Sequence, residues 1–198
     1  MLGSFIRRGL NQDEASGEAL LQVIAGSDTS AGVLRTAMLC LLTNPIAYRK
    51  LQADIDTGIA EGTISSPITD AEARQMPYLQ AVIKEALRLM PPASGPLFKQ
   101  VPPEGDTIDG KYIPSGTQIG VSILAIEHST RIFGADAELF RPERWLTAIP
   151  ENLAKMTSTV DLAFSYGKWQ CLGKSVAHME INKIFVEVRG GACVPIDC

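Results

Sequence analysis

The chain has 198 residues, of which 45% are hydrophobic and 20% are charged, a balance that is ordinary for a globular protein able to build a core. Its formal net charge of −4 gives no reason to expect a nucleic-acid partner. The spacing of the four cysteines is not typical of a zinc site.

Helices dominate the first half of the predicted structure. A long helix is predicted over residues 11–43, because Asn11 and the acidic residues after it mark a start and Pro45 marks a stop. Charged residues such as Asp28 interrupt its apolar stretch, which favours a buried helix over a membrane span. Two shorter helices are predicted at residues 46–60 and 77–90.

The second half is more varied. In chain order, the sequence predicts a β region at 97–124, an irregular segment at 133–163, a cysteine-bearing loop at 164–173, a helix at 172–188 and an irregular tail at 189–198. Within the β region, Asp109-Gly110 predicts a tight hairpin, and a strand is predicted over residues 118–124. These elements indicate a single, mainly α domain with small β-sheets.

The segment FSYGKWQCLG, residues 164–173, carries the most specific signal in the chain. It presents one thiol, Cys171, on a short loop before an amphipathic helix, and Gly167 lets the backbone turn tightly and approach a ligand closely. The dipole of the following helix would stabilise a thiolate at Cys171. A cysteine thiolate is one of the few axial ligands that proteins offer to haem iron. The alternative is a buried, inert cysteine in a turn.

The spacing Phe-x-x-Gly-x-x-x-Cys-x-Gly closely resembles the haem-ligand signature of the cytochrome P450 family. The resemblance implies haem b with Cys171 as the axial ligand, Phe164 packed flat beside the thiolate, and Gly173 at the start of the helix that leaves the cofactor. Trp169 stands where family members often have an arginine or histidine that holds a haem propionate, and Lys99 stands where many have a propionate-binding arginine. An indole N–H and a lysine ammonium make softer contacts than an arginine fork.

A second motif lies inside the long predicted helix. The segment AGSDTS, residues 25–30, matches the family's Ala-Gly-x-Asp-Thr-Thr/Ser pattern, and its glycine and hydroxyl residues predict a local bend and groove. The resemblance implies that Thr29 hydrogen-bonds to dioxygen at the haem and that Asp28 relays protons from water. Positioned proton delivery of this kind is worth about 10²–10⁴-fold in rate. The alternative is an ordinary kinked helix with a satisfied threonine.

The third motif is structural. Glu85 and Arg88 share one face of the predicted 77–90 helix, and apolar neighbours suggest that the pair is buried. The segment FRPERW, residues 140–145, resembles the family motif that brings Arg144 to this pair. The three side chains would form a hydrogen-bonded network that holds the cysteine loop in place. A solvated ion pair is the alternative for Glu85 and Arg88.

The resemblance covers residues 11–188 and implies the C-terminal half of the cytochrome P450 fold, truncated at both ends, as a single partial domain over residues 1–198. It implies a monooxygenase that inserts one oxygen atom of O2 into a small lipophilic substrate, and secondary metabolism is the expected setting. Residues 93–97 with Val23 and Ile24 would line the substrate pocket. Electrons would come from NADPH through a cytochrome P450 reductase that docks near Lys168 and Lys174.

Two further readings remain at this stage. The first is a truncated, catalytically inactive remnant that keeps the motifs but does not close a haem pocket. The second, a haem-thiolate isomerase or dehydratase, is disfavoured by the intact Asp28-Thr29 pair. The chain most resembles family members of the fungal microsomal type. That resemblance implies a location on the cytoplasmic face of the endoplasmic reticulum membrane, although we find no membrane anchor in the sequence.

Overall fold

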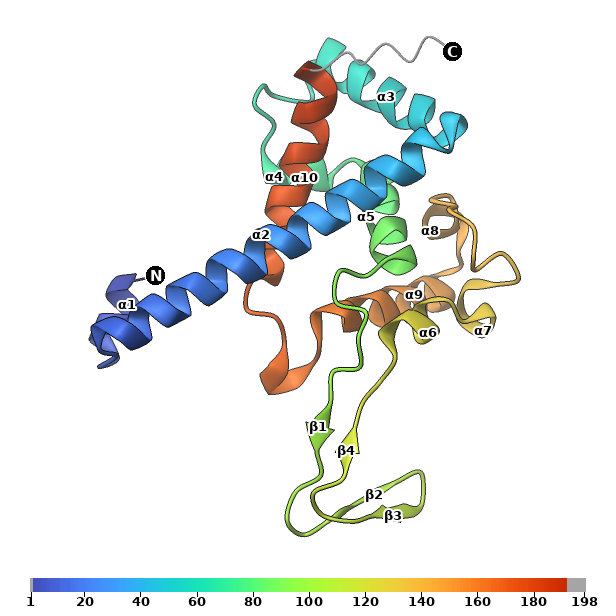
Figure 1. Cartoon of the computed structure of the whole chain (residues 1–198). Helices are drawn as coiled ribbons and strands as arrows, with labels where there is room; N and C mark the ends of the chain where they lie inside the picture. The colour runs from blue at the N-terminus through green and yellow to red at the C-terminus, as the bar shows by residue number, and fades with distance from the viewer. Residues whose placement is uncertain (1, 192–198) are drawn as a thin grey trace.

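The computed structural model describes residues 2–191, and the side chains of residues 3–188. It is mainly helical, with two small sheets, as the sequence predicted (Figure 1). The helices are α1 (Leu2–Arg7), α2 (Gln12–Leu42), α3 (Pro45–Ala60), α4 (Asp70–Arg74), α5 (Pro77–Leu89), α6 (Ile123–Glu127), α7 (Thr130–Phe133), α8 (Arg144–Thr147), α9 (Pro150–Asp161) and α10 (Lys174–Gly191). The strands are β1 (Lys99–Gln100), β2 (Asp106–Ile108), β3 (Lys111–Ile113) and β4 (Gln118–Ile119).

The long helix α2 starts and stops where its local sequence dictates. The Asn11 side chain accepts from the Glu14 N–H at 2.9 Å, and the Glu14 carboxylate accepts from the Asn11 N–H at 2.9 Å, which completes a capping box. Pro45 then opens α3, because its missing N–H costs nothing at the first position of a helix. Between these ends α2 is uninterrupted, so the AGSDTS segment lies within continuous helix.

The two sheets are antiparallel pairs, β1 with β4 and β2 with β3. The predicted hairpin is confirmed: Thr107 pairs with Tyr112, and the connecting residues Asp109 and Gly110 have φ of 50° and 75°. Two residues in this left-handed region form the turn whose twist matches that of the flanking strands, and Asp-Gly is a favoured pair for it.

Three boundaries differ from the prediction. The strand expected over 118–124 ends at Ile119, because Ser122 caps the Ala125 N–H and starts α6. The segment expected to be irregular over 133–163 contains α8 and α9, since Pro150 opens α9 and its buried Met156 and Val160 lie four residues apart on one face. The last helix continues three residues past 188, to Gly191. The rest of the predicted tail, with Cys193 and Cys198, lies outside the described residues.

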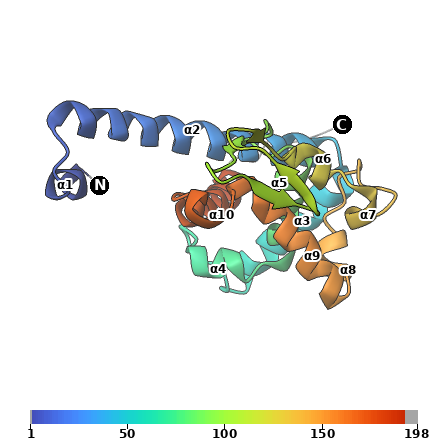
Figure 2. The same cartoon turned by 90° about the horizontal axis from the view of Figure 1, so that it is seen from below.

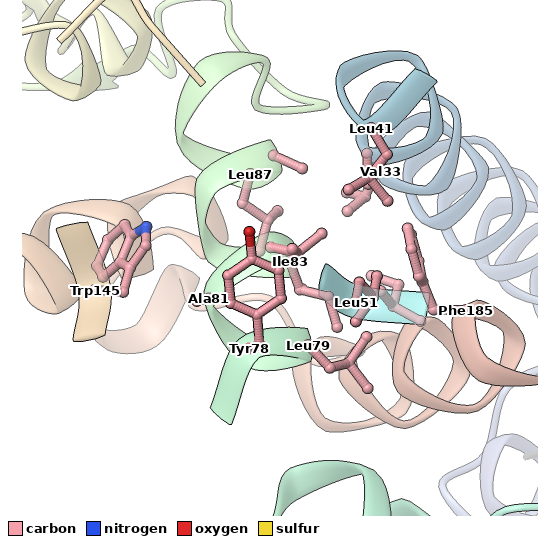
Figure 3. Close-up of a cluster of buried hydrophobic side chains, with 14 of the residues drawn as sticks. Val33, Leu41, Leu51, Tyr78, Leu79, Ala81, Ile83, Leu87, Trp145 and Phe185 are labelled. Atoms are coloured by element: carbon pink, nitrogen blue, oxygen red, sulfur yellow. The ribbon is translucent and has the colours of Figure 1, made fainter. Parts of the chain in front are cut away.

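Helix α5 is the centre of the core, with nine of its 13 residues buried. It contacts α2, α3, α9 and α10. Figure 3 shows Leu79, Ile83 and Leu87 of α5 facing side chains of α2, α3 and α10, while Trp145 of α8 lies on the other side of the helix. Because α5 is buried on several faces, the helices that pack on it are positioned by their contacts with its side chains.

Figures 1 and 2 show α1 and the N-terminal half of α2 projecting from this body. Leu20, Val23 and Ile24 on the projecting half are 61%, 64% and 58% exposed. No helix within residues 2–191 combines the length and the apolar composition needed to cross a membrane.

Helix α3 allows a direct measurement of what core burial contributes. Ile55 is 0% exposed and Ile46, on the same helix, is 77% exposed. We expect Ile55→Ala to lower the free energy of unfolding by about 2–5 kcal/mol, because the substitution leaves a cavity. Ile46→Ala should change it by less than about 0.5 kcal/mol. Urea midpoints followed by circular dichroism test this, and equal losses in the two variants would contradict the assigned core.

Candidate functional site

The cysteine loop is held in shape by its own backbone. The Cys171 N–H donates to the Phe164 carbonyl at 2.8 Å, which closes the loop, and the Gln170 N–H donates to the Gly167 carbonyl at 3.1 Å inside it. Two short 3₁₀ turns, η1 (Leu162–Phe164) and η2 (Gly167–Trp169), make up most of the path. The position of the thiol is therefore set by local hydrogen bonds.

Two residues of this loop have positive φ. Gly167 adopts φ of 63°, a conformation that glycine reaches without strain. Ser165 adopts φ of 60° with ψ of −172°, in a region that is almost confined to glycine and costs about 1–3 kcal/mol for other residues. Strain of this kind persists only where the surroundings impose it, and it concentrates at ligand-binding and active sites.

Cys171 is the exposed member of the two cysteines that the structure describes. Cys40 is half-buried on α2, and burial raises the pKa of its thiol. Around Cys171 the surface is apolar: Leu172 is fully exposed and Trp169 is 61% exposed. A thiol on an apolar, uncovered surface is what a flat hydrophobic ligand requires.

Two cations lie beside this surface. The Lys99 and Lys168 ammonium groups are 5.5 Å and 4.9 Å from the centroid of the Trp169 ring. Lys99 lies on β1 and Lys168 on η2, so they converge from distant parts of the chain. The pair gives the edge of the loop a local positive charge suited to carboxylates.

Contacts across the loop tie its two ends together. Lys174 Nζ is 2.9 Å from Asp161 Oδ1, which joins the start of α10 to the end of α9. Phe164 packs on the His178 ring at a centroid distance of 5.1 Å. Burial and the positive charges of Lys174 and Arg74 hold the pKa of His178 below its usual range, so the ring is neutral near pH 7. Gly173, next to the cysteine, lies where an added Cβ would be 3.9 Å from the Cys171 sulfur.

Asp28 and Thr29 lie on α2, Asp28 exposed and Thr29 partly buried. The Thr29 hydroxyl donates to the Ala25 carbonyl at 2.7 Å, the back-bond expected of a threonine inside a helix. None of the contacts found within residues 2–191 joins either residue to Cys171. A polar contact joins α2 to α10, where the Ser30 hydroxyl donates to Glu180 Oε2 at 3.2 Å. A cleft of about 430 Å³ lies there, lined by Gly26, Ser27, Ser30 and Glu180 among others.

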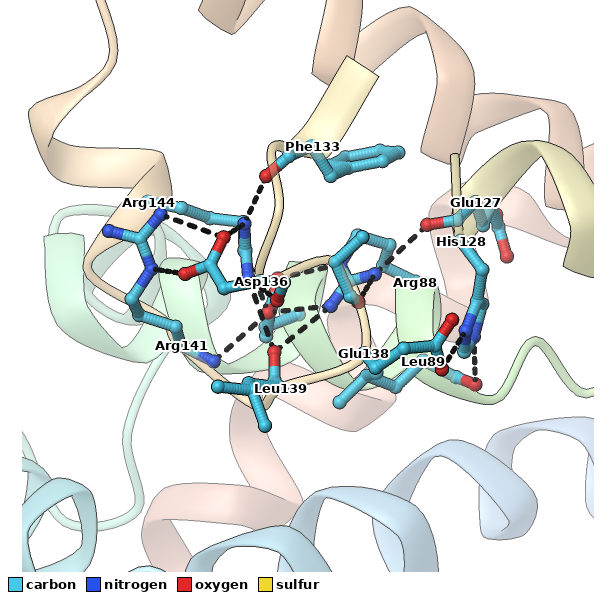
Figure 4. A network of polar contacts seen from close by, with 12 residues as sticks. Arg88, Leu89, Glu127, His128, Phe133, Asp136, Glu138, Leu139, Arg141 and Arg144 are labelled. Atoms are coloured by element: carbon cyan, nitrogen blue, oxygen red, sulfur yellow. Dashed lines mark hydrogen bonds and ion pairs between the residues drawn. The ribbon is translucent and has the colours of Figure 1, made fainter. Parts of the chain in front are cut away.

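The third motif forms one buried network around the Glu85 carboxylate, part of which Figure 4 shows. Glu85 and Arg88 are 0% exposed and Arg144 is 3% exposed. Glu85 Oε1 accepts from Arg88 Nη2 and Arg144 Nε, each at 2.9 Å, and from the Arg141 N–H at 3.0 Å. Oε2 accepts from Arg88 Nε at 3.0 Å and from Trp145 Nε1 at 2.9 Å. One carboxylate therefore joins α5, α8 and the loop before α8.

Both arginines use all their donors. Besides Glu85, Arg88 donates to the carbonyls of Glu127, Ala137 and Leu139 at 2.9, 2.6 and 3.2 Å. Arg144 donates to the carbonyls of Phe133, Asp136 and Leu139 and to the Asp136 carboxylate. A guanidinium has five N–H donors, so neither is left with an unsatisfied one.

A family model described as cytochrome P450 matches residues 5–188 of the chain. The chain belongs to the cytochrome P450 family. It is 47% identical over 189 residues to the cytochrome P450 monooxygenase ABA1 of Pyricularia oryzae, a match that covers 95% of this chain and 37% of that protein. It is 43% identical over 188 residues to the monooxygenase aba1 of Botryotinia fuckeliana, with the same two shares. A pisatin demethylase of Fusarium vanettenii is 40% identical over 168 residues, 85% of this chain and 32% of that protein. The chain thus spans about a third of the length of these relatives.

Two members of the network around Glu85 were not predicted from the sequence. Trp145 is the last residue of the FRPERW motif, and the available signal was its indole N–H, which needs a hydrogen-bond partner when buried. Asp136 lies in no motif that would have indicated its contact with Arg144. Burial acts to raise the pKa of Asp136, but the charges and hydrogen bonds of Arg144, with the charge of Arg141, outweigh it and hold this pKa below its usual range.

Glu127, beside this network, is also a residue that the sequence did not single out. It is 0% exposed, and neither carboxyl oxygen has a hydrogen-bond partner among the described residues. Burial raises the pKa of Glu127 to about 9, against the lowering effect of the Arg88 charge. A neutral carboxyl group at pH 7 follows, because a buried carboxylate without donors is far more costly.

Arg144 offers a test of the network. In Arg144→Lys one ammonium replaces a five-donor fork, so buried acceptors on Glu85 and the nearby carbonyls lose their partners. We expect the free energy of unfolding to fall by about 3–5 kcal/mol. The exposed Arg141→Lys, whose ion pair with Asp136 is at the surface, should cost no more than about 1 kcal/mol. Urea denaturation measures both, and a mild Arg144→Lys would mean that the network is dispensable.

Glu127 offers a test by pH. The folded state keeps a proton that the unfolded chain releases near its ordinary pKa of 4.5, so stability falls as pH rises from about 5 to 9. The Glu127 contribution to this slope should reach about 1.4 kcal/mol per pH unit. Glu127→Gln should remove that contribution, whereas Glu151→Gln, exposed on α9, should leave the slope unchanged. Identical slopes in the wild type and Glu127→Gln would show that Glu127 does not hold a proton in the fold.

Proposed function

We propose that this chain is the haem-binding portion of a cytochrome P450 monooxygenase that oxidises a small lipophilic molecule. The observation that carries the proposal is the exposed Cys171 thiol on a locally closed, strained loop whose surface is apolar. Haem, when bound, would supply the activation of O2. The donor chemistry fits that group, since Cys171 offers a single sulfur and the network around Glu85 holds the preceding helices in place.

The other residues of the loop have supporting roles in this proposal. Lys99 and Lys168, gathered on Trp169, would hold the haem propionates. Phe164, packed on His178, would limit the access of water to the sulfur. Gly167 and Gly173 would let the backbone lie close to the flat face of the ligand.

Thr29 and Asp28 would hold and transfer protons in this proposal. The Thr29 hydroxyl donates to the Ala25 carbonyl in this structure, and donation to a bound molecule would replace that hydrogen bond. Asp28 is exposed and can exchange protons with water. Electrons would come from NADPH through a reductase, and the substrate would be a small lipophilic molecule of secondary metabolism; one fungal relative is named for the demethylation of pisatin.

The second candidate function is a chain that keeps the motifs but does not turn over substrate. Val23 and Ile24, expected to line the substrate pocket, are 64% and 58% exposed, and Leu172 beside the thiol is fully exposed. A substrate pocket covers most of its ligand, and within the third of the relatives' length that this chain spans these side chains do not form such a pocket.

An optical spectrum separates the two candidates. With haem added, reduced and under carbon monoxide, the wild type should show the red-shifted Soret band typical of thiolate ligation. Cys171→Ala should abolish that band, and Cys40→Ala, which removes a thiol far from the loop in sequence, should keep it. The same band in Cys171→Ala would refute the ligand assignment. No haem uptake by the wild type would favour the second candidate.

A further inference from the structure

A second cleft, of about 330 Å³, lies away from the AGSDTS segment and the cysteine loop. We call it the meander cleft. It is lined by Thr130, Arg131, Ile132, Phe133, Gly134, Arg141, Arg144, Thr147, Ala148, Asn152, Lys155 and Met156. Four of these side chains are cationic, and none of the lining residues is acidic. The cations come from α7, α8, α9 and the loop before α8, so they converge on one hollow and are not a stripe along one helix.

The donors of these four cations are not equally available. All five N–H donors of Arg144 are used in hydrogen bonds to Glu85, Asp136 and backbone carbonyls. Arg141 donates to the Asp136 carboxylate through Nε and through one hydrogen of Nη2. No partner for its Nη1 is found among the described residues. Arg131 and Lys155 are exposed and form no ion pair within the part of the chain that the structure describes. Three cationic groups can therefore point donors at a ligand.

The charges in the cleft are also unbalanced. Asp136 and Glu85 compensate the charges of Arg141, Arg144 and Arg88 only in part, and no carboxylate is paired with Arg131 or Lys155. Like charges that converge without counter-ions repel one another, and a hollow with protein walls strengthens that repulsion. An anion that bridges them removes the repulsion and gains charge-assisted hydrogen bonds.

We propose that the meander cleft binds a phosphate group, either as inorganic phosphate or as a phosphomonoester. Donors that approach from α7, from α9 and from the loop before α8 suit a tetrahedral oxyanion better than a planar carboxylate. Arg131 and Arg141 offer the forked N–H geometry that phosphate oxygens accept, and Lys155 adds a point charge. Thr130 and Asn152, neutral and polar, complete the lining where an ester group would extend. The site is independent of Cys171 and of haem.

The direct test is a titration with inorganic phosphate at constant ionic strength, with chloride replaced stepwise and binding followed by calorimetry. The Arg131→Gln/Lys155→Gln double variant should bind phosphate at least about tenfold more weakly than the wild type, since it loses two charge-assisted contacts. The matched control, Arg35→Gln/Lys111→Gln, removes the same charge from two exposed positions outside the cleft and should bind as the wild type does. Circular dichroism confirms that both double variants fold.

A second arm identifies the source of the phosphate. Vesicles of phosphatidylcholine with and without phosphatidic acid are sedimented with each variant. Binding that requires both phosphatidic acid and the intact cleft assigns a lipid headgroup, whereas binding of free phosphate alone assigns a soluble ligand. Equal phosphate affinity in the two double variants would overturn the proposal, because the binding would then be diffuse surface attraction. Failure of the wild type to bind either probe would overturn it too.

The outcome does not depend on the haem proposal. Cys171→Ala should bind phosphate as the wild type does, because the cysteine does not line the meander cleft. A chain that binds phosphate without taking up haem would refute only the function proposed for the cysteine loop, and the reverse result would refute only the meander cleft.

Discussion

The structure depends on one buried carboxylate. Glu85 accepts five hydrogen bonds, from two arginine side chains, an indole and a backbone N–H, and so fixes α8 and the loop before it on α5. Such a network adds little net stability, because desolvation of the charges offsets their attraction. Its contribution is geometric. Arg88 and Arg144 also donate to backbone carbonyls of residues 133–139. These hydrogen bonds fix the backbone of a segment that has little regular secondary structure.

The network around Glu85 supports the cysteine loop through α9. Met156 and Val160 place α9 in the core beside α5, and Asp161 at its end pairs with Lys174 at the start of α10. The loop between them is closed by the Phe164–Cys171 hydrogen bond and stores the strain of Ser165. A strained loop on rigid supports keeps the Cys171 thiol in one place, whereas the same loop on mobile supports would relax.

The sequence predicted the parts of this arrangement that local chemistry decides. The start of α2 at Asn11, the Asp109-Gly110 turn and the Glu85–Arg88 spacing each act within a few residues. The contact of Arg144 with Glu85 was expected from the family motif, whereas the contact of Arg144 with Asp136 depends on tertiary structure and has no signal in the sequence. Helix α9 was misjudged because prolines around it suggested irregular chain, although proline at a first helical position favours a helix. The burial of Glu127 could not be predicted for another reason, because glutamate is expected at the surface.

In the proposed function, haem ligation and substrate turnover would rest on different parts of the molecule. The network around Glu85 and the closed loop are complete within α5, α8, α9 and the start of α10. The substrate side expected from the family resemblance includes Val23 and Ile24 in the projecting half of α2, and both side chains are exposed in this chain, which spans about a third of the length of its relatives. The packing that this chain contains is concentrated around α5, and it supports the loop that carries Cys171. Under the proposed function, haem binding at Cys171 and oxidation of a substrate can therefore be tested separately.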